Sequence, residues 1–161
     1  MDLDQQIQTL IDSAPEDGVT PTMMAMIAPV IKAVAAQLVH PQYYLLQTID
    51  DGWLMTTLSH RAQATVEKNV VYAYPTLEDA RSGSRSARDP QITALPVPVT
   101  HILFQMLAMK VIHSIIFLRT SNNLQDGIEV SRERLEQLIK HHVQTIRSQD
   151  QPSNKSRTDI A

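Results

Sequence analysis

Two short runs of aromatic, β-branched and aliphatic residues meet at the dipeptide Asp51-Gly52, and this stretch most constrains how the chain folds. Asp-Gly suits a two-residue type I′ turn, because both central positions of that turn need a positive φ. Counting outward from the turn predicts that Asp50 faces Trp53 and that Gln47 faces Thr56. Apolar residues fall on both faces of this predicted hairpin, so we expect helices to cover the sheet.

The composition indicates one folded core. A chain of 161 residues with 43% hydrophobic residues is long enough for one core and short for two ordinary domains. The absence of cysteine excludes a disulfide framework, a thiolate metal site and thiol catalysis. A formal net charge of −3 argues against a general polyanion binder, so we do not expect a nucleic-acid partner.

The hydropathy pattern predicts a protein of the cytoplasm. Residues 1–6 lack the basic and apolar regions of a secretory signal. The longest apolar stretch, Ile102–Leu118, is interrupted by Gln105, Lys110 and His113. We therefore expect no membrane span.

Helical spacing of apolar residues predicts two helices before the hairpin. The first, Leu3–Ile11, is short, and we expect it to dock loosely. The second runs from Thr20, as N-cap, to about Val39, and Pro29 should kink it or mark its true start. This helix carries more apolar surface than one small sheet can cover, so a homodimer interface would absorb the excess. Its first apolar stripe comprises Met23, Ile27, Val30, Val34 and Leu38, and its second comprises Met24, Ile31 and Ala35.

The segment after the hairpin predicts a third strand, Val66–Tyr74, which completes a three-strand antiparallel meander. Thr76 then caps a short helix that ends at about Arg81. Residues 82–91 are rich in serine and arginine, so we expect a mobile loop there.

The last third of the chain alternates between helix and strand. Thr100 is placed to cap a helix over His101–Lys110, and Val111–Thr120 is typical of a buried strand. A hairpin loop leads back into Ile128–Val130, and Ser131 caps a closing helix that runs to about Arg147.

These elements predict an α+β fold in which helices pack on an antiparallel sheet made of the meander and the second hairpin. The order is helix, three strands, helix, two strands, helix, with the short helix in front. The predicted organisation is a short helix and turn over residues 1–19, a single domain over 20–147, and a disordered polar tail over 148–161.

This order of elements resembles the type III secretion chaperone fold, which the YbjN-like proteins share. The resemblance covers Thr20 to Arg147. It rests on the element order, on the turn at Asp51-Gly52-Trp53, and on a short strand at Ile128-Glu129-Val130 that passes straight into the last helix. It implies a small dimer that binds a partner chain on its surface. That family has no active-site residues that could be matched to positions of this sequence.

The histidines do not form a recognisable metal motif. His141 and His142 are adjacent on a predicted helix, so they point about 100° apart and cannot ligate one ion as an i, i+4 pair does. His101 and His113 have no neighbouring carboxylate at ligand spacing. We therefore assign them structural roles and expect neither a metal nor another cofactor.

Two other features suggest chemistry, and ordinary local structure explains both better. Asp50 and Asp51 stand side by side, but a tight turn accounts for both. Ser131 lacks the glycine-flanked strand-turn-helix motif of a nucleophile, so we interpret it as a cap. The chain's four glycines form no phosphate-binding loop.

The predicted loop with Arg81, Arg85 and Arg88 supports an alternative function. Three arginines on a flexible segment suit phosphates or an acidic partner, and phosphorylation of the intervening serines would cancel their charge. The competing interpretation is a solvated surface loop.

Our leading hypothesis is a non-enzymatic interaction protein, a chaperone-like or assembly adaptor that acts as a homodimer on another protein. The alternative is a regulatory module that binds an anionic ligand or nucleic acid through the arginine loop. An enzyme with a site assembled from scattered residues such as His60, His101 and Asp50 stays open as a third reading. The residues predicted to bind the partner are Met23, Met24, Ile27, Ile31, Tyr44, Trp53 and Met55.

Overall fold

The computed structural model of the chain describes residues 2–15, 17, 20–48, 52–60, 63–82, 90–121 and 123–149. Over these residues it has five helices and six strands, and the predicted α+β class is confirmed. Within this described part, every helix is too short or too polar to cross a membrane. The predicted loop at 82–91 and the predicted tail fall largely on residues 83–89 and 150–161, which lie outside it.

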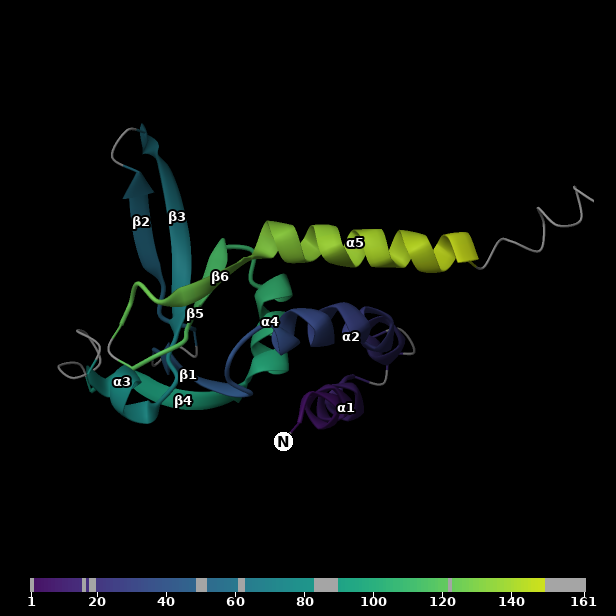
Figure 1. Cartoon of the computed structure of the whole chain (residues 1–161), viewed down its shortest axis with the longest axis horizontal. Coiled ribbons are helices and arrows are strands. Elements are labelled where there is room, and N and C mark those ends of the chain that lie inside the picture. The colour runs from purple at the N-terminus through teal and green to yellow at the C-terminus, as the bar shows by residue number, and fades with distance from the viewer. Residues whose placement is uncertain are drawn as a thin grey trace, which may run out of the picture.

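The described part of the chain begins with two helices, and six strands and three further helices follow (Figure 1). The helices are α1 Leu3–Ser13, α2 Thr20–Ala36, α3 Leu77–Ser82, α4 Val99–Ala108 and α5 Arg132–Gln149. The strands are β1 Gln42–Gln47, β2 Thr56–His60, β3 Gln63–Ala73, β4 Thr93–Pro98, β5 Ser114–Leu118 and β6 Gly127–Ser131.

The strands form two sheets rather than the single antiparallel sheet expected. One sheet pairs β1 with β4, and the other has the order β2-β3-β5-β6. The β3–β5 pair is parallel, whereas the other pairs are antiparallel. Tyr44 and Tyr74 join the two sheets, because each backbone N–H donates to the other's carbonyl oxygen, at 2.7 and 2.9 Å.

The register predicted for the first hairpin is wrong. Gln47 pairs with Trp53 and not with Thr56. The Thr48 N–H donates to the Gly52 carbonyl oxygen at 2.9 Å. Thr48 and Gly52 therefore close the turn, whereas a type I′ turn at Asp51-Gly52 would be closed by Asp50 and Trp53. Gly52 also lacks the positive φ of that turn. The acidic pair of the turn lies outside the described residues.

The main partner of β1 is a segment that the sequence predicted only to be extended. Residues 42–47 of β1 pair antiparallel with 93–98 of β4, so the predicted meander is divided between two sheets. Pro96 and Pro98 lack the backbone N–H that a central strand needs on both sides. Their place in β4 is physically acceptable, because β4 is an outer strand of a two-stranded sheet.

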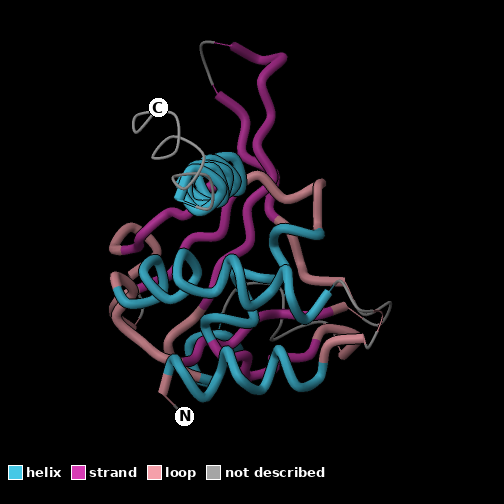
Figure 2. Tube along the Cα trace, turned by 90° about the vertical axis from the view of Figure 1, so that its right-hand side faces the viewer, coloured by secondary structure: helices cyan, strands magenta, loops and turns pink. Residues whose placement is uncertain are grey.

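Helix α4 lies at the centre of the core. Its buried side chains pack with residues from α2, β1, β3, β5 and α5 in one apolar cluster. On the far side of α4 from the sheet, α1, α2 and α5 lie in successive tiers (Figures 1 and 2). The residues of α4 that are fully buried are Val99, Thr100, Ile102, Leu103 and Met106.

Helix α1 is held by a buried polar cluster and not loosely, as the sequence suggested. Gln6 is 1% exposed, and its side-chain N–H donates to the Pro41 carbonyl oxygen at 2.9 Å. Its Oε1 accepts from the Thr100 hydroxyl at 2.8 Å and from the Thr100 N–H at 3.1 Å. The His101 ring donates from Nε2 to the Gln6 carbonyl oxygen at 3.2 Å. One glutamine therefore joins α1 to the start of α4.

Local capping signals were good predictors at two of the four predicted caps. Ser131 accepts from the Arg134 N–H at 3.1 Å, and Thr76 accepts from the Asp79 N–H at 3.1 Å, so both predicted caps are confirmed. Thr20 is not the cap of α2, since its own N–H donates to Asp17 at 2.7 Å. The prediction for Thr100 is also wrong, because that residue is buried inside α4.

Candidate functional site

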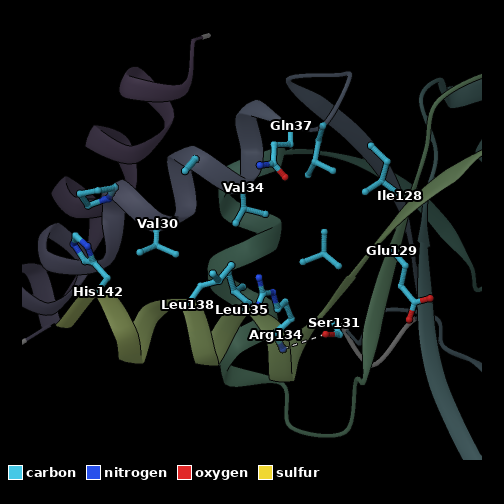
Figure 3. A pocket seen from close by; sticks show the side chains of 14 residues that line it. Val30, Val34, Gln37, Ile128, Glu129, Ser131, Arg134, Leu135, Leu138 and His142 are labelled. Atoms are coloured by element: carbon cyan, nitrogen blue, oxygen red, sulfur yellow. Dashed lines mark hydrogen bonds between the residues drawn. The ribbon is translucent and has the colours of Figure 1, made fainter. Parts of the chain in front are cut away.

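An open groove of about 730 Å³ lies between α2 and α5 and runs along β6 (Figure 3). The two helices form its walls and β6 borders its floor. The side chains of Val30 and Val34 face those of Leu135 and Leu138 across the groove. The sequence predictions did not include this groove.

Each wall is one face of a helix. On α2 the lining positions recur every three or four residues, which is the spacing of a single helical face. The wall of α5 follows the same spacing. Both walls are mainly apolar, and most of their side chains are half-buried or exposed. The groove is lined from α2 by Pro29, Val30, Ala33 and Val34, from the turn after α2 by Gln37 and Leu38, and from α5 by Arg134, Leu135, Leu138 and His142.

The backbone edge of β6 borders the groove. The four consecutive residues 128–131 all line it, although neighbouring side chains on a strand point to opposite faces. Such a run indicates that the edge of the strand, and not one of its faces, is what the groove meets. β6 is the last strand of its sheet, so its outer edge pairs with no other strand among the described residues.

Glu129 and His142 are two of the polar residues that line this groove, the others being Gln37, Ser131 and Arg134. The Glu129 carboxylate points away from the apolar walls (Figure 3) and is held by the Lys68 ammonium and by the Ser114 hydroxyl, the latter at 2.6 Å. These hydrogen bonds, from Lys68 first and then Ser114, lower the pKa of Glu129 below its ordinary value of 4.5. His142 Nε2 is buried without a hydrogen-bond partner. The groove itself is therefore mainly apolar, with an imidazole nitrogen at one end.

Helix α5 is fixed chiefly at its first turn. The Arg132 side chain donates to the carbonyl oxygens of Ile112 and Lys110, each at 3.2 Å, and pairs with Glu136 at 2.6 Å. Leu135 is fully buried, whereas no later residue of α5 is buried among those described. The far half of the helix extends past the sheet (Figure 1).

The structure distributes the predicted partner-binding residues between the core and the surface. Ile31 is 0% exposed and Trp53 9% exposed, so these two side chains belong to the core. Met23 is 56% and Met55 37% exposed. The remaining three are half-buried: Met24, Ile27 and Tyr44. None of the seven lines the groove.

The predicted anion-binding residues stay untested as a group. Arg81 is exposed at the end of α3, while Arg85 and Arg88 lie outside the described residues. The binding of an anionic ligand through this loop therefore remains a prediction.

His113 and His101 make hydrogen bonds to backbone groups. His113 Nδ1 accepts from the Asn69 N–H at 2.9 Å. Burial lowers the pKa of His101 below 6.5, although its bond to the Gln6 carbonyl acts the other way. The described part of the chain holds no group of three or more His, Asp or Glu side chains placed to hold a metal ion.

No protein-family model matches this chain, and neither does any curated protein sequence or solved structure. The resemblance to the secretion chaperone fold thus stays a prediction that rests on element order.

A signal for the groove was present in the sequence. The second stripe of α2 supplies its buried residues Ile31 and Ala35, while Val30 and Val34 of the first stripe remain half-buried and line the groove. The apolar face of α5 was also visible in the residue spacing. What the sequence did not reveal is that these two faces lie opposite each other, since Val34 and Leu135 are 101 positions apart.

Proposed function

We propose that this chain is a non-enzymatic interaction protein that binds an extended, apolar segment of another protein in the α2–α5 groove. The observation that carries the proposal is the combination of two apolar helix faces with an edge of β6 that pairs with no strand in the described part of the chain. A strand edge offers backbone donors and acceptors to an incoming segment, and apolar walls bind its alternate side chains.

The chemistry of the groove supports a polypeptide rather than a small polar ligand. The groove has a volume of about 730 Å³ and is open to solvent, and seven of its ten wall residues are apolar. A segment that adds to β6 would satisfy the backbone groups of the strand and cover the half-buried side chains of Val34 and Leu138. A chaperone-like or assembly role, a cytoplasmic location and a homodimeric state are parts of the same proposal.

The experiment is site-specific photo-crosslinking in living cells. The crosslinking residue p-benzoylphenylalanine replaces Ala33, an exposed alanine on the groove wall of α2. The matched control replaces Ala25, which is exposed on the same helix and does not line the groove. We expect a discrete crosslinked product from position 33 and none from position 25.

Mass spectrometry of the crosslinked peptide identifies what occupies the groove. An apolar segment of another protein supports the proposal, and its loss on Glu129→Pro, which removes a backbone N–H that points away from β5, supports strand addition. A crosslink to a peptide of this chain would show a second copy in the groove and overturn the adaptor role. Equal products from positions 33 and 25 would show that the groove is not the binding surface.

A further inference from the structure

A second cavity, of about 440 Å³, opens beside α3. Helix α3 lies at the end of the molecule opposite the C-terminal end of α5 (Figure 1). The cavity is lined by the end of β3, by α3 and by the connection between β5 and β6. Leu118 contributes an apolar surface and is 2% exposed, while Thr120 and Asn123 are exposed polar residues of the lining.

Asp79 is the unusual residue of this cavity. It lines the cavity and is only 8% exposed. Its Oδ2 atom is buried and has no hydrogen-bond partner. A buried carboxylate oxygen without a donor is unfavourable, and native structures rarely leave one so. A bound molecule that donates a hydrogen bond would satisfy it.

Two tyrosines stand beside this carboxylate. Tyr72 and Tyr74 are two residues apart at the end of β3, so their side chains lie on the same face of the chain. Tyrosine rings attract cations placed over their faces. Among the described residues that line the cavity there is no lysine, arginine or histidine, so no basic side chain of the lining neutralises Asp79.

The electrostatics of Tyr74 agree with a cavity that disfavours anions. Burial raises the pKa of Tyr74 above 10.0, and the nearby Tyr72 and Asp79 groups raise it further. Burial opposes a charge of either sign at this place, whereas the negative charge of Asp79 opposes the phenolate and would favour a positive charge.

We propose that this cavity binds a protonated organic amine, whose ammonium group donates to Asp79 and whose carbon chain lies against Leu118 and the tyrosine rings. A metal ion fits less well, because the described residues bring no second and third acidic or imidazole ligand to Asp79. A neutral alcohol also fits less well, because it lacks the charge that a desolvated carboxylate favours. This site is separate from the α2–α5 groove and does not rest on the function proposed for it.

The test is a titration of the full ¹⁵N-labelled chain followed by two-dimensional NMR. The probes are n-butylammonium and n-butanol, which have similar size and differ in charge. We expect saturable shifts of the Tyr74, Leu118 and Thr120 amide signals with n-butylammonium, and an affinity for n-butanol that is lower by about tenfold or more. In Asp79→Asn the preference for the ammonium should disappear.

A matched control is Glu78→Gln, which removes the neighbouring acid of α3, an exposed residue outside this cavity. It should keep the preference for n-butylammonium. Equal affinities of the unaltered chain for the two probes, or no saturable shift at these amides, would overturn the proposal. If Asp79→Asn does not fold, the affinities of the unaltered chain for n-butylammonium and n-butanol still test whether the cavity prefers the charged amine.

Discussion

The two sides of α2 differ in how completely they are covered. On one side α1 and α4 close over the helix, and the polar groups at their junction are satisfied by Gln6. The ion pair between Lys32 and Asp4, at 2.7 Å, adds a surface link between α2 and α1. On the other side α5 is anchored only near Arg132 and Leu135, and the groove beyond stays open.

The side of α2 covered by α1 and α4 contributes to stability, whereas the side that faces α5 leaves room for a ligand. A buried polar cluster is valuable mainly because breaking it leaves partners unsatisfied. A half-covered apolar face contributes less to the fold and gains more from a binding partner. Changes on the closed side should therefore act on stability, and changes on the open side should act on binding.

The largest effect should come from the closed side. Gln6→Leu removes the acceptor of Thr100 and the donor to Pro41, so we expect a loss of about 3 kcal/mol in the free energy of unfolding. Urea denaturation followed by circular dichroism measures it. The matched control is Gln8→Leu, an exposed glutamine of the same helix, with a change of about 0.5 kcal/mol or less. Similar losses for both variants would mean that the cluster does not hold α1.

A smaller effect should come from the anchor of α5. Arg132→Ala removes the donors to Ile112 and Lys110, and we expect a loss of about 1.5 kcal/mol. Arg134→Ala, which changes an exposed arginine two residues further along α5, should cost about 0.5 kcal/mol or less. Equal costs in urea denaturation would place the anchor elsewhere along α5.

Acid should weaken the two sides in different pH windows. The folded-state pKa of His101 lies below 6.5, so its contribution is full above pH 6.5 and is lost as the pH falls through the lowered folded value. The folded-state pKa of Glu129 lies below 4.5, so its contribution is full above pH 4.5 and is lost below it. The exposed Lys68–Glu129 pair should supply about 1 kcal/mol or less.

Stability measured against pH separates these two residues. His101→Gln should flatten the decrease that begins below pH 6.5 and leave the lower window unchanged. Glu129→Gln should flatten only the decrease below pH 4.5. A profile in which either variant alters both windows would contradict this assignment.

The smallest effect on stability should come from the open side. Ala33→Glu places a charge on the groove wall at an exposed position, so the unfolding free energy should change by about 0.5 kcal/mol or less. Ala25→Glu should behave alike in denaturation. Only Ala33→Glu should reduce the yield of a crosslink formed from Gln37, which lines the same wall. Equal yields in the two variants would show that α2 does not contact the bound segment.

The sequence predicted the helices well, because the signals that define a helix are local. Ser131 and Thr76 cap helices that begin within one residue of them, and residue spacing identified the apolar faces. The two capping errors have a common cause. In both cases another side chain binds the predicted cap residue: Asp17, only three residues earlier, accepts from the Thr20 N–H, and Gln6 of another helix accepts from the Thr100 hydroxyl. The first error was therefore local, whereas the second depends on a residue 94 positions away.

Strand pairing was predicted less well, because it depends on distant partners. An Asp-Gly dipeptide suggested a register that the structure shifts by three residues, since Gln47 pairs with Trp53 instead of Thr56. The pairing of β1 with β4 joins residues about fifty positions apart, through a segment whose prolines indicated only an extended chain. The parallel β3–β5 pair had no local signal. The groove could not be predicted for the same reason, as its walls come from two such distant segments.

The contact between Gln6 and Thr100 has a consequence for how the chain folds during synthesis. The two residues are 94 positions apart, so α1 is synthesised long before Thr100, the residue that donates to Gln6. At about 5–20 residues per second, α1 waits about 5–20 s for Thr100 to be added. Over that time its Gln6 face has no α4 to bind, so we expect α1 to join the fold late, after α4 has formed.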